Sequence, residues 1–340
     1  MTANHQILFA SRPEGMPEAS NFDYQPIDVP TPGEGEMLLR MIFLSVDPYM
    51  RGRMILAKSY AAPFELGEPI YSGGVAEVME SNGGKFEKGA IVGGIMNWRE
   101  YQTHDGSELT QIPNSGLPYS YALGALGMPG MTAWAGLNLH GKPKEGETLV
   151  VSAASGAVGA MVAQMGKAKG LRVVGVAGGA EKCAYVTDEL GADACVDHRD
   201  PDLNKKLKEA CPDGVDIYFE NVGGATLDAV IPLFNPFARM PLCGMIAHYN
   251  DLGAPTGPDR APALMRALLT MRVTVRGFIV TDHWNQFPEF LAETAPQIAA
   301  GKIKVKETVT DGLENAPSAF ISLLSGGNFG KQIVRVGDDP

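Results

Sequence analysis

The chain carries two different patterns of apolar and polar positions, which meet near residue 120. Before that point, short apolar runs are interrupted by Gly and Pro, a pattern that predicts a β-rich domain. A helical segment and a short loop at residues 123–139 then lead into the second pattern. The strands of the β-rich part are expected at residues 36–46, 70–79 and 90–96, with turns at Pro32-Gly33, Gly73-Gly74 and Gly83-Gly84.

From residue 147 onward, apolar strands alternate with helices. Six strands joined by crossovers predict a doubly wound parallel sheet, so the fold class is α/β. The C-terminal tail either returns to the β-rich domain or extends the sheet, with strands near 303–309 and at 331–336 around a helix at 316–324. The six strands are expected at residues 148–151, 173–177, 194–197, 215–220, 240–245 and 273–280, and the helices at 161–169, 180–191, 203–210, 263–271 and 284–300.

The turn after the first of these six strands is built from small residues. Ala153, Gly156 and Gly159 follow an A-x-x-G-x-x-G spacing between a buried strand and a helix. Small residues let a pyrophosphate reach the backbone N–H groups and the positive end of the helix without a Cβ in the way. The spacing alone also fits an ordinary strand-to-helix connection, but the strand before it and the helix after it favour a dinucleotide site.

The end of the next strand indicates which dinucleotide is bound. An NAD site usually has Asp or Glu about 20 residues after the glycines, to bind the ribose 2′-hydroxyl. This chain has Gly178 and Gly179 there, and Lys182 follows in the first turn of a helix, where the dipole disfavours a cation unless an anion lies beside it. We therefore expect NADP(H), against the alternative that Lys182 is a solvated surface residue next to Glu181.

The composition of the chain limits the kinds of molecule that the protein is expected to bind. The net charge of −11 opposes binding to nucleic acid or to an anionic membrane. The four cysteines include no C-x-x-C pair and the six histidines are dispersed, so no metal site is predicted. The N-terminus lacks the basic start and apolar core of a signal peptide, and no apolar run approaches about 20 residues. We expect a cytoplasmic protein that binds a small molecule or a second copy of itself.

Motifs along almost the whole chain resemble one family. The chain is similar to the zinc-free branch of the medium-chain dehydrogenase/reductases, specifically the prostaglandin reductase (leukotriene B4 12-hydroxydehydrogenase) group, and looks most like its bacterial NADPH-dependent curcumin reductases. The matching motifs are LSVDPYMRGRM at residues 44–54, GMPGMTAWAGL at 127–137, AASGAVG at 153–159, AGGAEK at 177–182, YFENVGG at 218–224, CGMIAHYN at 243–250, GFIV at 277–280 and GGNFGK at 326–331.

The resemblance implies a fold and an activity. The fold is a GroES-like catalytic domain, residues 1–122 and 302–340, around a Rossmann NADP-binding domain, residues 123–301. The activity is the metal-free, NADPH-dependent reduction of the carbon–carbon double bond of α,β-unsaturated ketones and aldehydes, usually by a homodimer. The implied cofactor residues are Gly156, Ala157, Val158 and Gly159 at the pyrophosphate, Gly178, Lys182 and His198 at the 2′-phosphate, and Asn221, Cys243, Gly244, Tyr249, Phe278, Ile279, Val280 and Asn328 along the rest of the dinucleotide.

One of these positions departs from the family pattern. His198, followed by Arg199, stands where mammalian members carry a tyrosine that contacts the 2′-phosphate. A histidine can still donate a hydrogen bond, which would make the phosphate contact more dependent on pH. The alternative is that His198 is only a polar residue that ends a strand.

Conjugate reduction also needs a hydrogen-bond donor for the substrate's carbonyl oxygen, and a neutral tyrosine is a suitable donor at pH 7. The resemblance implies Tyr249 for this role, with Tyr49 as a second candidate, and for each the alternative is a tyrosine that only packs in the interior. Asp47 and Arg51 are interpreted as structural, as an internal ion pair. Water is the expected proton source.

Three other functions, two of them enzymatic, are alternatives to this interpretation. A quinone oxidoreductase of the same superfamily would use the same cofactor site, and a non-catalytic NADPH-binding scaffold would keep that site without turnover. A metal-dependent alcohol dehydrogenase would need cysteine in its catalytic domain, but the chain has none before Cys183.

Overall fold

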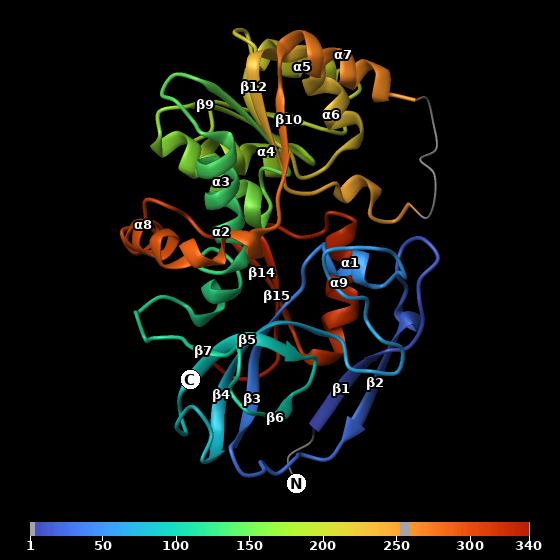
Figure 1. Ribbon diagram of the computed structural model, residues 1–340, viewed down its shortest axis with the longest axis vertical. Helices are drawn as coiled ribbons and strands as arrows, with labels where there is room; N and C mark the ends of the chain where they lie inside the picture. The colour runs from blue at the N-terminus through green and yellow to red at the C-terminus, as the bar shows by residue number, and fades with distance from the viewer. Residues whose placement is uncertain (1–3, 252–258, 340) are drawn as a thin grey trace. The chain divides into compact units, whose positions relative to one another are not determined.

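Residues 4–251 and 259–339 are described by the computed structural model, in which the chain forms two compact units (Figure 1). The first unit consists of Met1–Gly124 and Glu307–Pro340, and the second is Ala125–Lys306. The first is β-rich and the second alternates strands with helices, which confirms the expected fold class. Within the described ranges, no helix is both long enough and apolar enough to cross a membrane.

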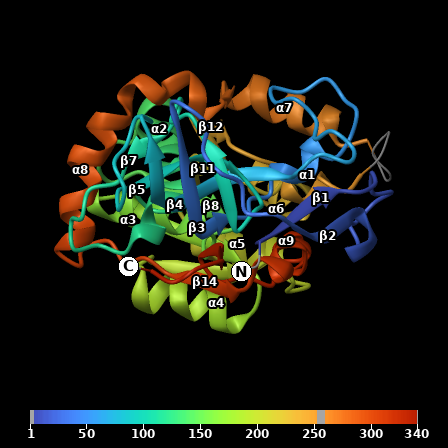
Figure 2. The ribbon, with the colours of Figure 1, turned by 90° about the horizontal axis from the view of Figure 1, so that it is seen from below.

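The first unit is built on a seven-stranded, mostly antiparallel sheet. Figure 2 shows four neighbouring strands, β7, β5, β4 and β3, side by side in the order of their pairing. A separate antiparallel pair is formed by β1 (Asn4–Phe9) and β2 (Phe22–Ile27). The order of the large sheet is β14 (Glu307–Asp311), β15 (Lys331–Arg335), β3 (Glu36–Ser45), β4 (Tyr71–Asn82), β5 (Ile91–Asn97) and β7 (Thr110–Gln111), and β6 (Tyr101–His104) also pairs with β3.

The C-terminal tail returns to this unit, which decides between the two alternatives for it. β15 pairs antiparallel with β3, and β14 pairs parallel with β15. Between them, α9 (Ala316–Leu324) inserts Phe320 and Leu323 into a core that also contains Phe9 and Trp98. The expected strand near 303–309 begins only at Glu307.

The expectation of a turn at Gly73-Gly74 was wrong, because both glycines lie inside β4. Gly74 pairs with Leu44 on one side and Gly94 on the other. A Cβ at Gly74 would lie 3.1 Å from the side chains of Met41 and Met96. Glycine at this position therefore allows the side chains of Met41 and Met96 to pack closely on the strand, whereas the sequence predicted a turn.

The second unit is a six-stranded sheet in which every neighbouring pair is parallel. The first strand along the chain, β8, lies in the middle, and all five of its residues are buried, as a parallel strand covered on both faces requires. This order is the doubly wound one that the alternation predicted. The strands are, from edge to edge, β10 (Ala194–Asp197), β9 (Arg172–Ala177), β8 (Thr148–Ser152), β11 (Val215–Phe219), β12 (Phe234–Leu242) and β13 (Thr274–Gly277).

The helices of the second unit differ from expectation mainly at their ends. The helix expected at 284–300 begins with the 3-10 helix η7 (Val280–Gln286) and continues as α8 (Phe287–Ala299). The helix α6 (Gly224–Val230) was missed, because it starts at a pair of glycines, Gly223 and Gly224, that both have positive φ. The other helices are α2 (Met128–Ala135), α3 (Ala157–Ala168), α4 (Ala180–Ala184), α5 (Leu203–Ala210) and α7 (Ala261–Met271).

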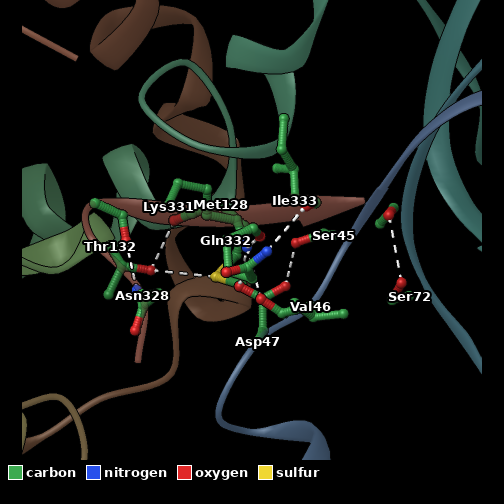
Figure 3. Close-up of polar contacts among 12 residues, drawn as sticks. Ser45, Val46, Asp47, Ser72, Met128, Thr132, Asn328, Lys331, Gln332 and Ile333 are labelled. Carbon is green, nitrogen blue, oxygen red and sulfur yellow. Dashed lines mark hydrogen bonds and ion pairs between the residues drawn. The ribbon is translucent and has the colours of Figure 1, made fainter. Parts of the chain in front are cut away.

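A buried ion pair joins the residues that follow β3 to β15 in the first unit (Figure 3). The Lys331 ammonium, on β15, donates to Asp47 Oδ1 at 2.9 Å, to the Val46 carbonyl at 2.8 Å and to the Gln332 carbonyl at 3.0 Å. The side chains of Lys331 and Asp47 are 4% and 8% exposed. Ser45 donates to the other carboxylate oxygen. The partner of Asp47 is therefore Lys331, so the expected pair with Arg51 was wrong.

Replacing Lys331 tests how much this ion pair stabilises the first unit. Lys331→Met leaves the Asp47 carboxylate buried without its cation, so we expect the free energy of unfolding to fall by about 3–5 kcal/mol. Urea unfolding followed by circular dichroism measures the change.

A matched control is Arg335→Met on the same strand, which removes an exposed ion pair with Asp311. Exposed pairs contribute little, so this variant should unfold close to the wild type. If both variants lose equally little stability, the buried pair is not the stabilising contact described here.

Candidate functional site

The turn between β8 and α3 brings a helix N-terminus against the carboxyl end of a strand. Ala153 has a φ of 50°, which turns the chain sharply after the strand. A Cβ at Gly159 would lie 2.2 Å from the Ala153 carbonyl oxygen, so only glycine permits α3 to pack this closely on the turn. Gly156 precedes the helix as its N-cap, and Ala157 and Val158 form its first positions. This is a cradle of the kind that accepts phosphate groups.

A second turn, after β9, gathers basic side chains. A Cβ at Gly178 would lie 2.8 Å from His198 Nε2 and 3.2 Å from the Arg199 guanidinium, so the glycine makes room for both. Burial lowers the pKa of Lys182, and the charge of Arg199 lowers it further. Burial and then Arg199 also lower the pKa of His198. Basic groups that disfavour one another's charge form a site suited to an anion.

Arg199 is the member of this basic cluster that sequence reading did not assign to the site. It follows His198 directly after β10, and its backbone N–H donates to Asp197 Oδ1 at 3.0 Å. The signal that could have identified it is its position just beyond the carboxyl end of a strand next to β9, where ligands of a doubly wound sheet bind.

The end of β11 is linked to the end of β8 by Asn221 and Ser152. The backbone N–H of Asn221 donates to Ser152 Oγ at 2.7 Å, and its side-chain amide donates to the Ser152 carbonyl at 2.8 Å. Burial and the charge of Glu220 raise the pKa of the neighbouring Cys243 thiol to about 12, which disfavours its thiolate form.

A pocket of about 380 Å³ opens beyond the ends of β12 and β13 in the second unit. It brings together five residues that were predicted to bind the cofactor, whereas Val280 begins η7 outside the lining. Tyr249 Oη accepts the Met245 N–H at 3.5 Å, and a Cβ at Gly244 would lie 2.9 Å from that oxygen. The absence of a side chain at Gly244 therefore leaves room for the tyrosine hydroxyl. The five are Cys243, Gly244, Tyr249, Phe278 and Ile279.

The two remaining predicted residues, Tyr49 and Asn328, belong to the first unit. Burial raises the pKa of Tyr49, and the charge of Asp47 raises it further. Its phenol therefore stays protonated and able to donate through the ordinary pH range. The Asn328 side chain donates to the Gly330 carbonyl at 2.7 Å, in the turn that leads into β15.

Across residues 4–251 and 259–339, no group of three or more His, Cys, Asp or Glu side chains could hold a metal ion.

Two family models match the chain. One, described as the N-terminal domain of oxidoreductase, matches residues 5–112, and the other, described as zinc-binding dehydrogenase, matches residues 157–295. The NADPH-dependent curcumin reductase of Escherichia coli (strain K12) is 50% identical over 338 residues, covering 99% of this chain and 98% of that one. The 2-alkenal reductase (NADP(+)-dependent) of Nicotiana tabacum is 41% identical over 340 residues, covering 98% of each.

Solved structures agree with these relatives. The crystal structure of CurA from Vibrio vulnificus in complex with NADPH is 50% identical, with a TM-score of 0.94, and the match covers 98% of this chain and 100% of that one. The class of protein is therefore an oxidoreductase with a dinucleotide-binding α/β domain. The chain belongs to the zinc-independent medium-chain dehydrogenase/reductase family, in the group of the curcumin, alkenal and prostaglandin reductases, as the motifs indicated.

Proposed function

We propose that this protein reduces the carbon–carbon double bond of α,β-unsaturated ketones and aldehydes with NADPH. The observation that carries the proposal is the 50% identity over nearly the full length of a protein named NADPH-dependent curcumin reductase. The name 2-alkenal reductase of a second relative supports the substrate class, because a 2-alkenal is an α,β-unsaturated aldehyde.

The residues of the second unit fit the cofactor. The turn at Gly156–Gly159 would hold the pyrophosphate, since Gly159 lets the N-terminus of α3 pack closely on this turn of small residues. Lys182, His198 and Arg199 would hold the 2′-phosphate, whose negative charge would relieve the mutual repulsion of these basic side chains. Asn221 and the lining of the 380 Å³ pocket would contact the remainder of the dinucleotide, and Asn328 is proposed to contact it from the first unit. When bound, NADPH supplies the hydride for the β-carbon.

The chain's own contribution to the reaction is charge stabilisation. Negative charge develops on the carbonyl oxygen as the double bond is reduced, and a preorganised hydrogen-bond donor there lowers the barrier by about 3–4 kcal/mol. We assign this role to the hydroxyl of Tyr249 in the pocket, with Tyr49 as a second donor kept protonated by burial and by Asp47. The proton for the α-carbon comes from water.

The direct test follows NADPH absorbance with a linear enone, curcumin, a small quinone and a saturated ketone in separate reactions, each repeated with NADH and with EDTA. We expect turnover of the enone and curcumin with NADPH, without inhibition by EDTA. Tyr249→Phe in the same assay should lower kcat for the enone ten-fold or more, because it removes the donor and leaves the ring.

Other outcomes of this assay separate the alternatives. Turnover of the quinone alone would make the protein a quinone oxidoreductase, and tight NADPH binding without any turnover would make it a scaffold. An unchanged kcat in Tyr249→Phe would mean that another group stabilises the oxygen.

The preference for NADPH is tested by Lys182→Glu. The variant replaces a cation of the phosphate site with an anion, so we expect the Kd for NADPH to rise ten-fold or more while the Kd for NADH changes little. Fluorescence titration measures both constants. Lys208→Glu, on the exposed side of α5, makes the same charge change away from the site and should alter neither constant. Equal effects of Lys182→Glu on both cofactors would exclude this phosphate site.

We also propose that the protein is a homodimer. All four residues of β13, an edge strand of the sheet in the second unit, are exposed. Nearby α7 presents Met265 and Leu269 at 62% and 78% exposure. An unpaired strand edge beside apolar side chains is the surface that a second copy would cover. Light scattering of the purified protein would contradict the proposal if it gave the mass of one chain.

A cytoplasmic location stays a prediction.

A further inference from the structure

The carboxylate of Glu220 is completely buried just beyond the end of β11, at 0% exposure. Its Oε1 accepts hydrogen bonds from Ser152 Oγ at 2.9 Å, from the Val222 N–H at 2.6 Å and from the Gly223 N–H at 3.0 Å. All three bonds are donated to one carboxylate oxygen, an arrangement that stabilises the ionised form. In that form the residue brings a negative charge into the interior of the second unit.

This charge lacks a cation to balance it. In the parts of the chain that the structure describes, Glu220 forms no ion pair, and its second oxygen, Oε2, is buried without a hydrogen-bond partner. Such an arrangement costs stability, because an ion in the protein interior loses its hydration. By contrast, the buried Asp47 has Lys331 within 2.9 Å. Neither the fold nor the mechanism proposed above uses the uncompensated charge of Glu220.

Glu220 lies next to the pocket. Its backbone carbonyl accepts the N–H groups of Cys243 at 2.9 Å and Gly244 at 3.1 Å, and both residues line that pocket. The charge of Glu220 also acts on a group of this pocket, because it raises the pKa of the Cys243 thiol. The basic cluster of Lys182, His198 and Arg199 belongs to the opposite half of the sheet, after β9 and β10. In a doubly wound sheet a dinucleotide spans both halves, so its nicotinamide end belongs on the side of β11 and β12.

We propose that the buried charge of Glu220 makes the site bind the oxidised cofactor, NADP⁺, more tightly relative to NADPH. The nicotinamide ring is neutral in NADPH and carries one positive charge in NADP⁺, which has lost a hydride. A fixed negative charge near the ring stabilises only the second of these states, so it favours hydride donation. The inference rests on the proposed function, in that the cofactor must be NADP(H).

The test compares two dissociation constants and does not depend on activity. The Kd values for NADP⁺ and for NADPH are measured by calorimetry on the wild type and on Glu220→Gln, which keeps the shape and an acceptor oxygen but removes the charge. We expect the ratio of the Kd for NADP⁺ to the Kd for NADPH to rise about ten-fold in the variant, because a nearby unit charge in the protein interior has an effect of that order. A role in structure alone would weaken both ligands by the same factor and leave the ratio unchanged.

Two controls isolate the position of the charge. Asp216→Asn removes a carboxylate near the amino end of the same strand, where Asp216 accepts the Thr148 N–H at 2.8 Å, and should leave the ratio as in the wild type. Adenosine 2′,5′-bisphosphate, which lacks the nicotinamide, should bind the wild type and Glu220→Gln alike. A ratio that rises as much in Asp216→Asn would overturn the proposal, because net charge would then be the cause.

A second variant covers the case in which Glu220→Gln does not fold, which thermal unfolding would reveal. Glu220→Met has a similar volume and removes the charge, and it also removes the acceptor of the Val222 and Gly223 N–H groups. The same rise in the ratio is expected in this variant, and an unchanged ratio in either folded variant overturns the inference. A wild type that binds neither NADP⁺ nor NADPH would instead contradict the proposed function.

Discussion

Parallel pairing around β8 is the constraint on which the second unit depends. In a parallel sheet every strand ends at the same edge, so residues that are far apart in the chain meet there. The turn after β8, the basic cluster after β9 and β10, and the pocket after β12 and β13 are all consequences of this one arrangement. The chemistry of each strand end is separate, but the sheet places all of them along one edge.

Glycine residues allow close contacts between atoms at that edge of the sheet. At Gly159 a side chain would collide with the backbone of the turn, at Gly178 with His198, and at Gly244 with the Tyr249 hydroxyl. None of these three positions has a positive φ, so they are not needed for unusual backbone conformations. They allow atoms to approach one another more closely than a Cβ permits. Gly74 in the first unit has the same use inside a strand.

The two buried carboxylates, Asp47 and Glu220, differ in whether a cation is paired with them. Asp47 is neutralised by Lys331, whose ammonium has an acceptor for each of its three protons, and the pair ties the residues after β3 to β15. Glu220 is held by hydrogen bonds to one oxygen only, and no cation among the described residues pairs with it. The first arrangement stabilises the fold. The second is costly for the fold, and this is why we connect it with ligand binding.

The sequence alone was sufficient for the fold class, the family and the turns that suit a dinucleotide, because these depend on local patterns. An apolar strand, a small-residue turn and an amphipathic helix lie within about 25 residues of one another, and their periodicity is visible without a partner. Lys182 was predicted as a phosphate ligand for the same reason, since it follows a strand end at a fixed spacing. The residues of the pocket came from motifs that resemble the family.

Only the tertiary structure decided which distant groups meet. Lys331 and Asp47 are 284 positions apart, and Ser152 and Glu220 are 68 apart, so no local pattern could pair them. The sequence suggested Arg51, in the same motif, as the partner of Asp47, but the strand order brings Lys331 there instead. The same limit applied to Gly73-Gly74, where a glycine pair looks identical in a turn and in a crowded strand. Pairing between strands fixes these contacts, and strand pairing is a property of the folded chain.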